Sequence, residues 1–146
     1  MDLDPTTQPA IRALRPSDLS FIYATWLRQI VMGYCVGLEP STSSRAVYHR
    51  HKRIIDGILS RSATLVATLP DDSDVILGYL VVEKLADPDA RPVIHWAYTK
   101  GPWRGMGVAR LLFGELDPQR CVCSHLAKAV DLCKWPGLVF DPRSVR

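Results

Sequence analysis

One glycine-rich segment of the sequence is the strongest candidate for a ligand-binding site. Gly101-Pro102-Trp103-Arg104-Gly105-Met106-Gly107-Val108-Ala109 lies directly between an expected strand and an expected helix. Glycines at such a turn let several backbone N–H groups point into one concavity, and the start of a helix adds a field that favours an anion. The segment therefore predicts a binding site for a phosphate-bearing ligand, of which a pyrophosphate is the natural example.

Two common phosphate-binding motifs do not fit this segment. The Gly-x-Gly-x-x-Gly spacing of a dinucleotide-binding Rossmann turn is absent, and the first expected strand lies far upstream of the glycines. A Walker A loop would need Gly-Lys followed by Ser or Thr, which the segment lacks. The sequence therefore disfavours a dinucleotide-binding Rossmann domain and a P-loop nucleoside triphosphatase.

Apolar periodicity places the segment in an α+β chain with a mixed sheet. The expected order is β-α-α-β-β-β-α-β-α-β, with helices packed on the sheet. Residues 1–9 are expected to form a flexible tail and residues 10–146 a single domain. Strands are expected at 11–14, 63–69, 75–83, 93–99, 121–123 and 138–140. Helices are expected at 17–30 with Ser17 as N-cap, from a cap at 39–42 to about Leu59, at 108–116, and from Leu126 to about Lys134.

Composition and charge exclude some classes of protein. The chain has 146 residues, 47% of them hydrophobic, and a formal net charge of only +3, which does not by itself imply a polyanionic partner. The longest uncharged apolar stretch, 30–38, is far too short to span a membrane, and the first residues resemble no signal peptide. We therefore expect a cytoplasmic protein.

The four cysteines suggest neither a disulfide framework nor a metal site. They form no Cys-x-x-Cys pair and are few for a secreted protein of this length, so reduced thiols are expected. Cys121-x-Cys123-x-His125 offers suitable zinc ligands, but this spacing is uncommon in structural zinc sites and a strand would splay the side chains. The sequence therefore predicts no metal.

The glycine-rich segment resembles a known motif. Arg104-Gly105-Met106-Gly107-Val108-Ala109, followed by Leu111-Leu112, is similar to the R/Q-x-x-G-x-G/A acyl-CoA-binding motif of the GNAT N-acyltransferases. Weaker resemblances to the same family cover the opening strand and helix at 11–19, Leu77-Gly78-Tyr79, and Ala129-x-x-Leu132-Cys133-x-x-x-Gly137. Most of the chain from residue 11 onward is covered by this resemblance, which implies a small GNAT-like acyltransferase domain.

The resemblance implies how an acyl-CoA would bind. Arg104, Gly105, Met106, Gly107, Val108 and Ala109 would supply backbone amides to the CoA pyrophosphate. The backbone of Ala97, Tyr98 and Thr99 would pair with the pantetheine arm. One of its N–H groups would face the thioester carbonyl, whose oxygen gains negative charge in the transition state.

The resemblance also implies two residues for proton transfer. His95 falls where many family members place a catalytic Glu, on the same strand face as Ala97 and Thr99, and its unperturbed pKa near 6.5 suits a base. Cys133 falls where the family usually has a Tyr that acts as general acid. Simpler interpretations remain open, namely that His95 packs beside Trp96 and that Cys133 is a small buried hydrophobe.

The chain departs from the family pattern near its end. The region between Arg104 and Leu126 is short, and no final hairpin follows Phe140. The acceptor side is therefore either unusually open or completed by a second subunit, and exposed strand edges make a homodimer a reasonable expectation.

The second expected helix is unusually basic. Residues 45–61 carry five Lys and Arg against one Asp, with Arg50, Lys52 and Arg53 close together. Such a face could attract an acidic or nucleic-acid acceptor, or it could simply be a solvated helix surface.

Two classes of function follow. The first is an acetyl-CoA-dependent N-acetyltransferase that acylates an amine, either a small molecule or a protein, by direct transfer. The second is a GNAT-like module that is non-catalytic or modifies DNA, as phage proteins resembling Mom do, and that binds nucleic acid through the basic helix.

Overall fold

A computed structural model of the chain describes residues 8–31, 44–114, 116–125 and 135–145. Within these ranges, six strands form one sheet in the order β1-β2-β3-β4-β5-β6. The strands are β1 (Ala10–Ala13), β2 (Ala63–Thr68), β3 (Ile76–Glu83), β4 (Val93–Thr99), β5 (Val122–Cys123) and β6 (Val139–Phe140). The pairs from β1 to β4 are antiparallel, whereas β4 pairs with β5 and β5 with β6 in parallel. The predicted mixed sheet is confirmed.

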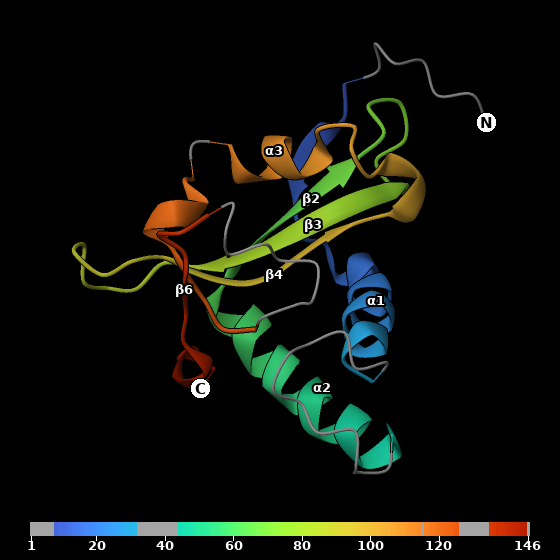
Figure 1. The fold of residues 1–146 in the computed structure, drawn as a ribbon. Helices are drawn as coiled ribbons and strands as arrows, with labels where there is room; N and C mark the ends of the chain where they lie inside the picture. The colour runs from blue at the N-terminus through green and yellow to red at the C-terminus, as the bar shows by residue number, and fades with distance from the viewer. Residues whose placement is uncertain (1–7, 32–43, 115, 126–134, 146) are drawn as a thin grey trace.

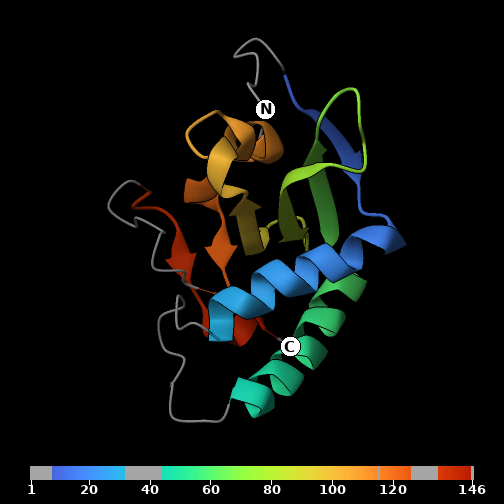
Figure 2. The same cartoon turned by 90° about the vertical axis from the view of Figure 1, so that its right-hand side faces the viewer.

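Among the residues that the structure describes, three helices cover the two faces of the sheet. The long helices α1 (Leu19–Val31) and α2 (Ser44–Arg61) lie on one face, and the short helix α3 (Val108–Phe113) lies on the other (Figure 1). Figure 2 shows α1 and α2 together in front of the sheet. All eight residues of β3 are buried because helices cover the central strand on both sides. No helix among the described residues is long and apolar enough to cross a membrane.

Each face of the sheet has its own hydrophobic core. The core under α1 and α2 contains Trp26, Ile55, Tyr79, Val81 and Trp96, and the core under α3 contains Leu77, Ile94, Trp103, Leu112 and Cys121. Trp26 and Trp96 stack with ring centroids 5.3 Å apart, which fixes α1 against β4. Each core therefore ties a helix to the strands that precede the glycine-rich segment.

Local contacts correct two predicted helix boundaries. Ser17 is not the N-cap, because residues Pro16–Asp18 form a 3-10 turn and the Asp18 carboxylate accepts a hydrogen bond from the Arg15 backbone N–H at 2.7 Å. Helix α3 ends at Phe113 because Gly114 adopts a φ of 56°, so Leu116 lies beyond the helix. The predicted cap at 39–42 and the predicted helix from Leu126 to Lys134 lie outside the described residues.

The start of α1 depends on one ion pair. The Asp18 carboxylate, 5% exposed, accepts hydrogen bonds from both terminal nitrogens of Arg12 at 2.7 and 2.8 Å. The Arg12 hydrogen bond lowers the pKa of Asp18 below its ordinary value. Since the folded pKa lies below the unfolded one, this stabilisation is complete above the unfolded pKa and is lost as pH falls through the folded pKa.

We expect Asp18→Asn to lower the free energy of unfolding near pH 7 by about 3 kcal/mol, because Arg12 loses its partner. The loss should shrink as the pH is lowered below the ordinary pKa of an aspartate. Urea unfolding at neutral and acidic pH measures both effects. Asp74→Asn is the matched control, since Asp74 is 89% exposed and lies 3.6 Å from Arg15, so it should cost less than about 0.5 kcal/mol. Equal losses for the two variants would contradict this role of Asp18.

Gly78 allows β3 to approach β4 and α3 closely. A Cβ at this position would lie 2.5 Å from the Tyr98 carbonyl oxygen and 3.2 Å from a Val108 methyl group. We expect Gly78→Ala to destabilise the protein by about 1–3 kcal/mol through overpacking. Thermal unfolding measures the loss, and Gly101→Ala is the control because a Cβ there meets nothing within 4 Å. A stability unchanged by Gly78→Ala would show that the strands can separate without cost.

Candidate active site

The strands β4 and β5 separate after a short stretch of pairing. Val93 and Ile94 pair with Val122 and Cys123, and the Ser124 N–H donates to the Ile94 carbonyl at 3.2 Å. Residues 97–99 pair with β3 on one side only, and no second strand among the described residues pairs with them, although the Thr99 carbonyl accepts a hydrogen bond from the Arg104 guanidinium. Backbone N–H and C=O groups on such an edge can pair with an extended ligand. Ala97, Tyr98 and Thr99 lie on this edge, and their contacts with the pantetheine arm stay a prediction.

The glycine-rich segment continues from this edge. Gly105 and Gly107 have φ angles of 78° and 83°, a conformation that other residues adopt at a cost. Within the part of the chain that the structure describes, no hydrogen bond uses the backbone N–H of Gly105, Gly107 or Val108 as donor. A Cβ at Gly107 would meet nothing within 4 Å, so there is room in front of these amides. The segment can hold an anion such as a pyrophosphate.

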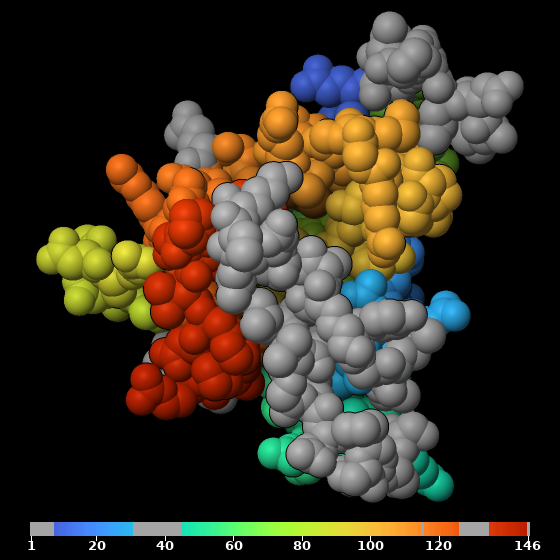
Figure 3. All heavy atoms as spheres, in the orientation of Figure 1, coloured from blue at the N-terminus to red at the C-terminus, as the bar shows by residue number. Residues whose placement is uncertain are grey.

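The segment is fixed to the protein body at two points. Trp103 is buried in the core under α3, and the Arg104 guanidinium donates to the Thr99 carbonyl at 3.2 Å. Between these anchors and the helix, residues 104–107 are exposed, and Figure 3 shows this part of the chain at the surface next to α1. Because α3 has only six residues, the predicted contribution of a helix dipole is smaller than that of the loop amides themselves.

A cleft of about 390 Å³ lies between α1 and this segment. It is lined by Phe21, Ala24, Thr25, Arg28 and Gln29 of α1, by Tyr98 of β4, and by Arg104. Tyr98 and Arg104 both belong to the predicted cofactor-binding set. The cleft therefore extends from the open edge of β4 toward α1, where an acceptor could approach.

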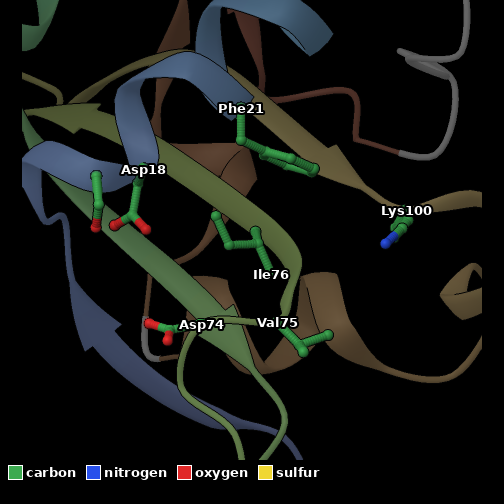
Figure 4. Close-up of a pocket in the computed structure, with 7 residues that line it drawn as sticks. Asp18, Phe21, Asp74, Val75, Ile76 and Lys100 are labelled. Atoms are coloured by element: carbon green, nitrogen blue, oxygen red, sulfur yellow. The ribbon is translucent and has the colours of Figure 1, made fainter.

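A second cleft, of about 520 Å³, lies at the start of α1 (Figure 4). Asp18 and Asp74 lie on one side of it, and Lys100 lies apart from both. The Asp18 carboxylate is already bound by Arg12 and by the Arg15 N–H. None of the predicted site residues lines this cleft, so we place the candidate site at the open edge of β4.

His95 occupies an irregularity of β4 that the sequence did not predict. Val81 lies opposite Trp96 and Val82 lies opposite Ile94, so His95 is an extra residue in β4, a β-bulge. The extra residue shifts the alternation of side chains. Ile94 packs under α3 and Trp96 under α1 and α2, although residues two positions apart in a regular strand would lie on the same face. The prediction that His95 shares a strand face with Ala97 and Thr99 is therefore wrong.

The His95 side chain is fully buried within a chain of polar groups. Its Nδ1 lies 2.7 Å from the Ser124 hydroxyl, and its Nε2 lies 3.6 Å from the Glu83 carboxylate. Glu83 in turn accepts a hydrogen bond from Arg61 at 2.8 Å. Because the His95 side chain is 0% exposed, a proton can reach it only through a neighbouring group.

The sequence did not predict two further members of this network of polar groups, Ser124 and His125. The Ser124 hydroxyl lies 2.9 Å from Nδ1 of His125, which the sequence analysis considered only as a zinc ligand. Burial, helped by the neighbouring His95 and His51, lowers the pKa of His125 to about 4, against a hydrogen bond with the His95 backbone that raises it. The signal that could have revealed them is the Ser-His pair directly after β5, which runs beside the strand that carries His95.

The other predicted site residues separate in the structure. Cys133, the predicted acid, lies outside the described residues. Cys121 packs in the core under α3, whereas His125 contacts Trp26 and Trp96 of the other core. Among the described residues, no three His, Cys, Asp or Glu side chains gather as metal ligands.

The basic helix is α2, and its cations are not equivalent. Lys52 binds Asp56 at 3.1 Å and lies over the Tyr23 ring, with 4.8 Å from its Nζ to the ring centroid. Arg50 and Arg53 are exposed. Nucleic-acid binding through Arg50, Lys52 and Arg53 therefore stays a prediction, with Lys52 already engaged by a carboxylate.

Comparison with known proteins supports the fold. No protein-family model and no curated protein matches the sequence. A protein of Pyrococcus furiosus, provisionally described as an acetyl transferase, is similar in structure over 88% of this chain and 89% of its own, with 16% identity and a TM-score of 0.63. The chain has the GNAT fold.

Two other solved structures are similar to parts of this GNAT fold. A GCN5-related N-acetyltransferase from Rhodopseudomonas palustris is 23% identical over 75% of this chain and 64% of its own, with a TM-score of 0.49. A GNAT family N-acetyltransferase from Escherichia coli, in complex with CoA, is 22% identical over 79% of this chain and 57% of its own, with a TM-score of 0.44. The chain thus spans less than two thirds of each of these two proteins.

Proposed function

We propose that the chain is an acetyl-CoA-dependent N-acetyltransferase that transfers the acetyl group directly to an amine. The observation that carries the proposal is that the edge at Ala97–Thr99, which pairs with no second strand among the described residues, lies next to a glycine-rich segment. Within the described residues, the backbone amides of Gly105, Gly107 and Val108 in this segment donate no hydrogen bond. An extended arm ending in a pyrophosphate fits these two features together, because the first offers a strand edge and the second offers anion-binding donors.

The chain's own groups would bind and orient the acyl-CoA, which supplies the activated thioester. Within residues 104–109, the amides of Gly105, Gly107 and Val108 are the donors proposed to hold the pyrophosphate, because those of Arg104 and Met106 already donate to the Gly101 and Trp103 carbonyls. The Arg104 guanidinium donates to the Thr99 carbonyl next to this segment. The backbone of Ala97–Thr99 pairs with the pantetheine arm and directs one N–H toward the thioester oxygen. A single donor of this kind contributes about 10²–10³-fold to the rate of acyl transfer in enzymes.

Proton transfer completes the reaction. An amine attacks only in its neutral form, so a proton must leave the acceptor, and we assign its final position to His95 beside Glu83. Cys133 is proposed as the acid that protonates the departing CoA thiolate, because a thiol can donate a proton near neutral pH. No group other than these side chains and the backbone donors is required.

Transfer of isotope-labelled acetyl groups tests the proposal. The purified chain is incubated with labelled acetyl-CoA and with amino acids, polyamines or lysine-containing peptides, and the amines are separated and counted. We expect label on one class of amine at a rate that depends on protein concentration. If none of the amines is labelled and calorimetry detects no acetyl-CoA binding at millimolar concentration, the proposal is wrong.

A further inference from the structure

The Ser124 hydroxyl lies between two imidazole rings. Its oxygen is 2.7 Å from Nδ1 of His95 and 2.9 Å from Nδ1 of His125. A hydroxyl has one proton, so it can donate to only one of these nitrogens, and the other nitrogen must carry a proton and donate to the oxygen. The two rings therefore hold opposite tautomers when both are neutral.

Glu83 decides which ring accepts. Its carboxylate lies 3.6 Å from Nε2 of His95, and this arrangement favours a proton on that nitrogen. Nδ1 of His95 then carries the lone pair and accepts from Ser124. His125 consequently donates its Nδ1–H to Ser124, which leaves the lone pair of His125 on Nε2.

His125 is more exposed than Glu83, His95 and Ser124 in this network of polar side chains. The His95 side chain is 0% exposed, Glu83 and Ser124 are 3% exposed, and His125 is only partly buried. The ring of His125 packs against Trp26 and Trp96 at centroid distances of 5.7 and 5.9 Å. Because Trp96 directly precedes the open edge of β4, His125 lies where β4 and β5 separate.

We propose that His125 is the catalytic base that takes the proton of the acceptor amine, and that Ser124 and His95 are positioning residues that pass this proton inward. The inference rests on the proposed function and makes it more specific. The ammonium group of the acceptor gives a proton to Nε2 of His125, whose Nδ1 proton moves to the Ser124 oxygen. The Ser124 proton moves to Nδ1 of His95, which leaves a neutral amine and an imidazolium beside Glu83.

The groups around His125 explain why the proton must move on through Ser124 to His95. His51 of α2 and His95 of β4 face it, while Glu83 of β3 and Arg61 of α2 lie behind His95. Burial and these two histidines lower the pKa of His125 to about 4, so its Nε2 lone pair is present at neutral pH. A base of such low pKa holds a proton weakly. Transfer of this proton to His95, beside the Glu83 carboxylate, places the positive charge next to a negative one.

The tautomers can be measured without knowing the acceptor. Nitrogen NMR of the imidazole rings in the full chain should show His125 protonated on Nδ1 and His95 protonated on Nε2. Ser124→Ala should return His125 to the Nε2–H tautomer, whereas Ser124→Thr should preserve the wild-type pattern. Thr64→Val is the matched control, because it removes a buried hydroxyl that has no hydrogen-bond partner among the described residues. Wild-type His125 protonated on Nε2 would overturn the relay.

Addition of acetyl-CoA separates failure of the relay from failure of the proposed function. We expect saturating acetyl-CoA to shift the ring signals of His125 and to leave those of His49, on the exposed face of α2, unchanged. If calorimetry detects binding but the His125 signals do not move, His125 is not the base although the cofactor site stands. If acetyl-CoA does not bind, the proposed function and the catalytic assignment both fail, while the tautomers still report the hydrogen bonds.

Discussion

Replacement of Gly107 by tryptophan is expected to weaken acetyl-CoA binding about a hundredfold or more, equivalent to roughly 2.7 kcal/mol. The glycine has a φ of 83° and open space in front of its Cα, so an indole would fill the place proposed for the pyrophosphate. A tryptophan would also resist the left-handed backbone that directs the neighbouring amides. Titration calorimetry on the purified variant measures the change.

Gly101→Trp is the matched control for this loss. Gly101 lies in the same exposed segment, a Cβ there also meets nothing within 4 Å, and its φ is not positive. We expect Gly101→Trp to retain the wild-type affinity within about threefold, because the added indole lies outside the proposed cradle. Equal losses from both variants would show that bulk anywhere in the segment is harmful, and unchanged affinity in Gly107→Trp would place the pyrophosphate elsewhere.

The second large effect is expected at His95. His95→Gln removes the group that finally holds the amine proton, so kcat for acetyl transfer should fall by about 10²–10⁴-fold. The acidic limb of the pH–rate profile should disappear in the variant, whereas the KM for acetyl-CoA should stay the same. Steady-state kinetics over a range of pH, with the amine that the labelling experiment identifies, measures all three quantities.

His51→Gln distinguishes chemistry from packing in this experiment. His51 is buried like His95 and its Nδ1 lies 3.2 Å from the Val47 carbonyl, but it makes no contact with Ser124 among the described interactions. We expect His51→Gln to keep kcat within a few fold and to keep the acidic limb. An acidic limb that survives in His95→Gln would discard the assignment of His95.

The local pattern of the sequence predicts the strand and the turn that form the candidate site. Residues 93–99 are rich in β-branched and aromatic residues, which favours a strand, and the strand is found with those bounds. The glycines that follow demand a turn, and two of them adopt the positive φ angles that make glycine necessary. Both features depend on neighbours in the chain, so they can be derived without the rest of the molecule.

The features that the sequence did not predict depend on distant partners. The bulge at His95 is a mismatch in the pairing of β3 with β4. The register between two strands cannot be derived from the sequence of either strand alone. The link from His95 to Ser124 joins residues that are 29 positions apart, through the parallel pairing of β4 with β5. Ser17 has the residue type of a helix cap, but the N-cap is Arg15, whose backbone N–H donates to the Asp18 carboxylate that the distant Arg12 guanidinium holds in place.

Amide NMR with acetyl-CoA tests whether the edge at residues 97–99 and the segment at 104–109 bind the cofactor. Backbone N–H signals of the full chain are recorded during a titration with acetyl-CoA. We expect the largest shifts at residues 97–99 and 104–109, with saturation in the micromolar range, because these amides are proposed to bind the pantetheine arm and the pyrophosphate. Shifts confined to α2, or no shift at millimolar acetyl-CoA, would contradict the assignment of this edge and segment as an acyl-CoA site.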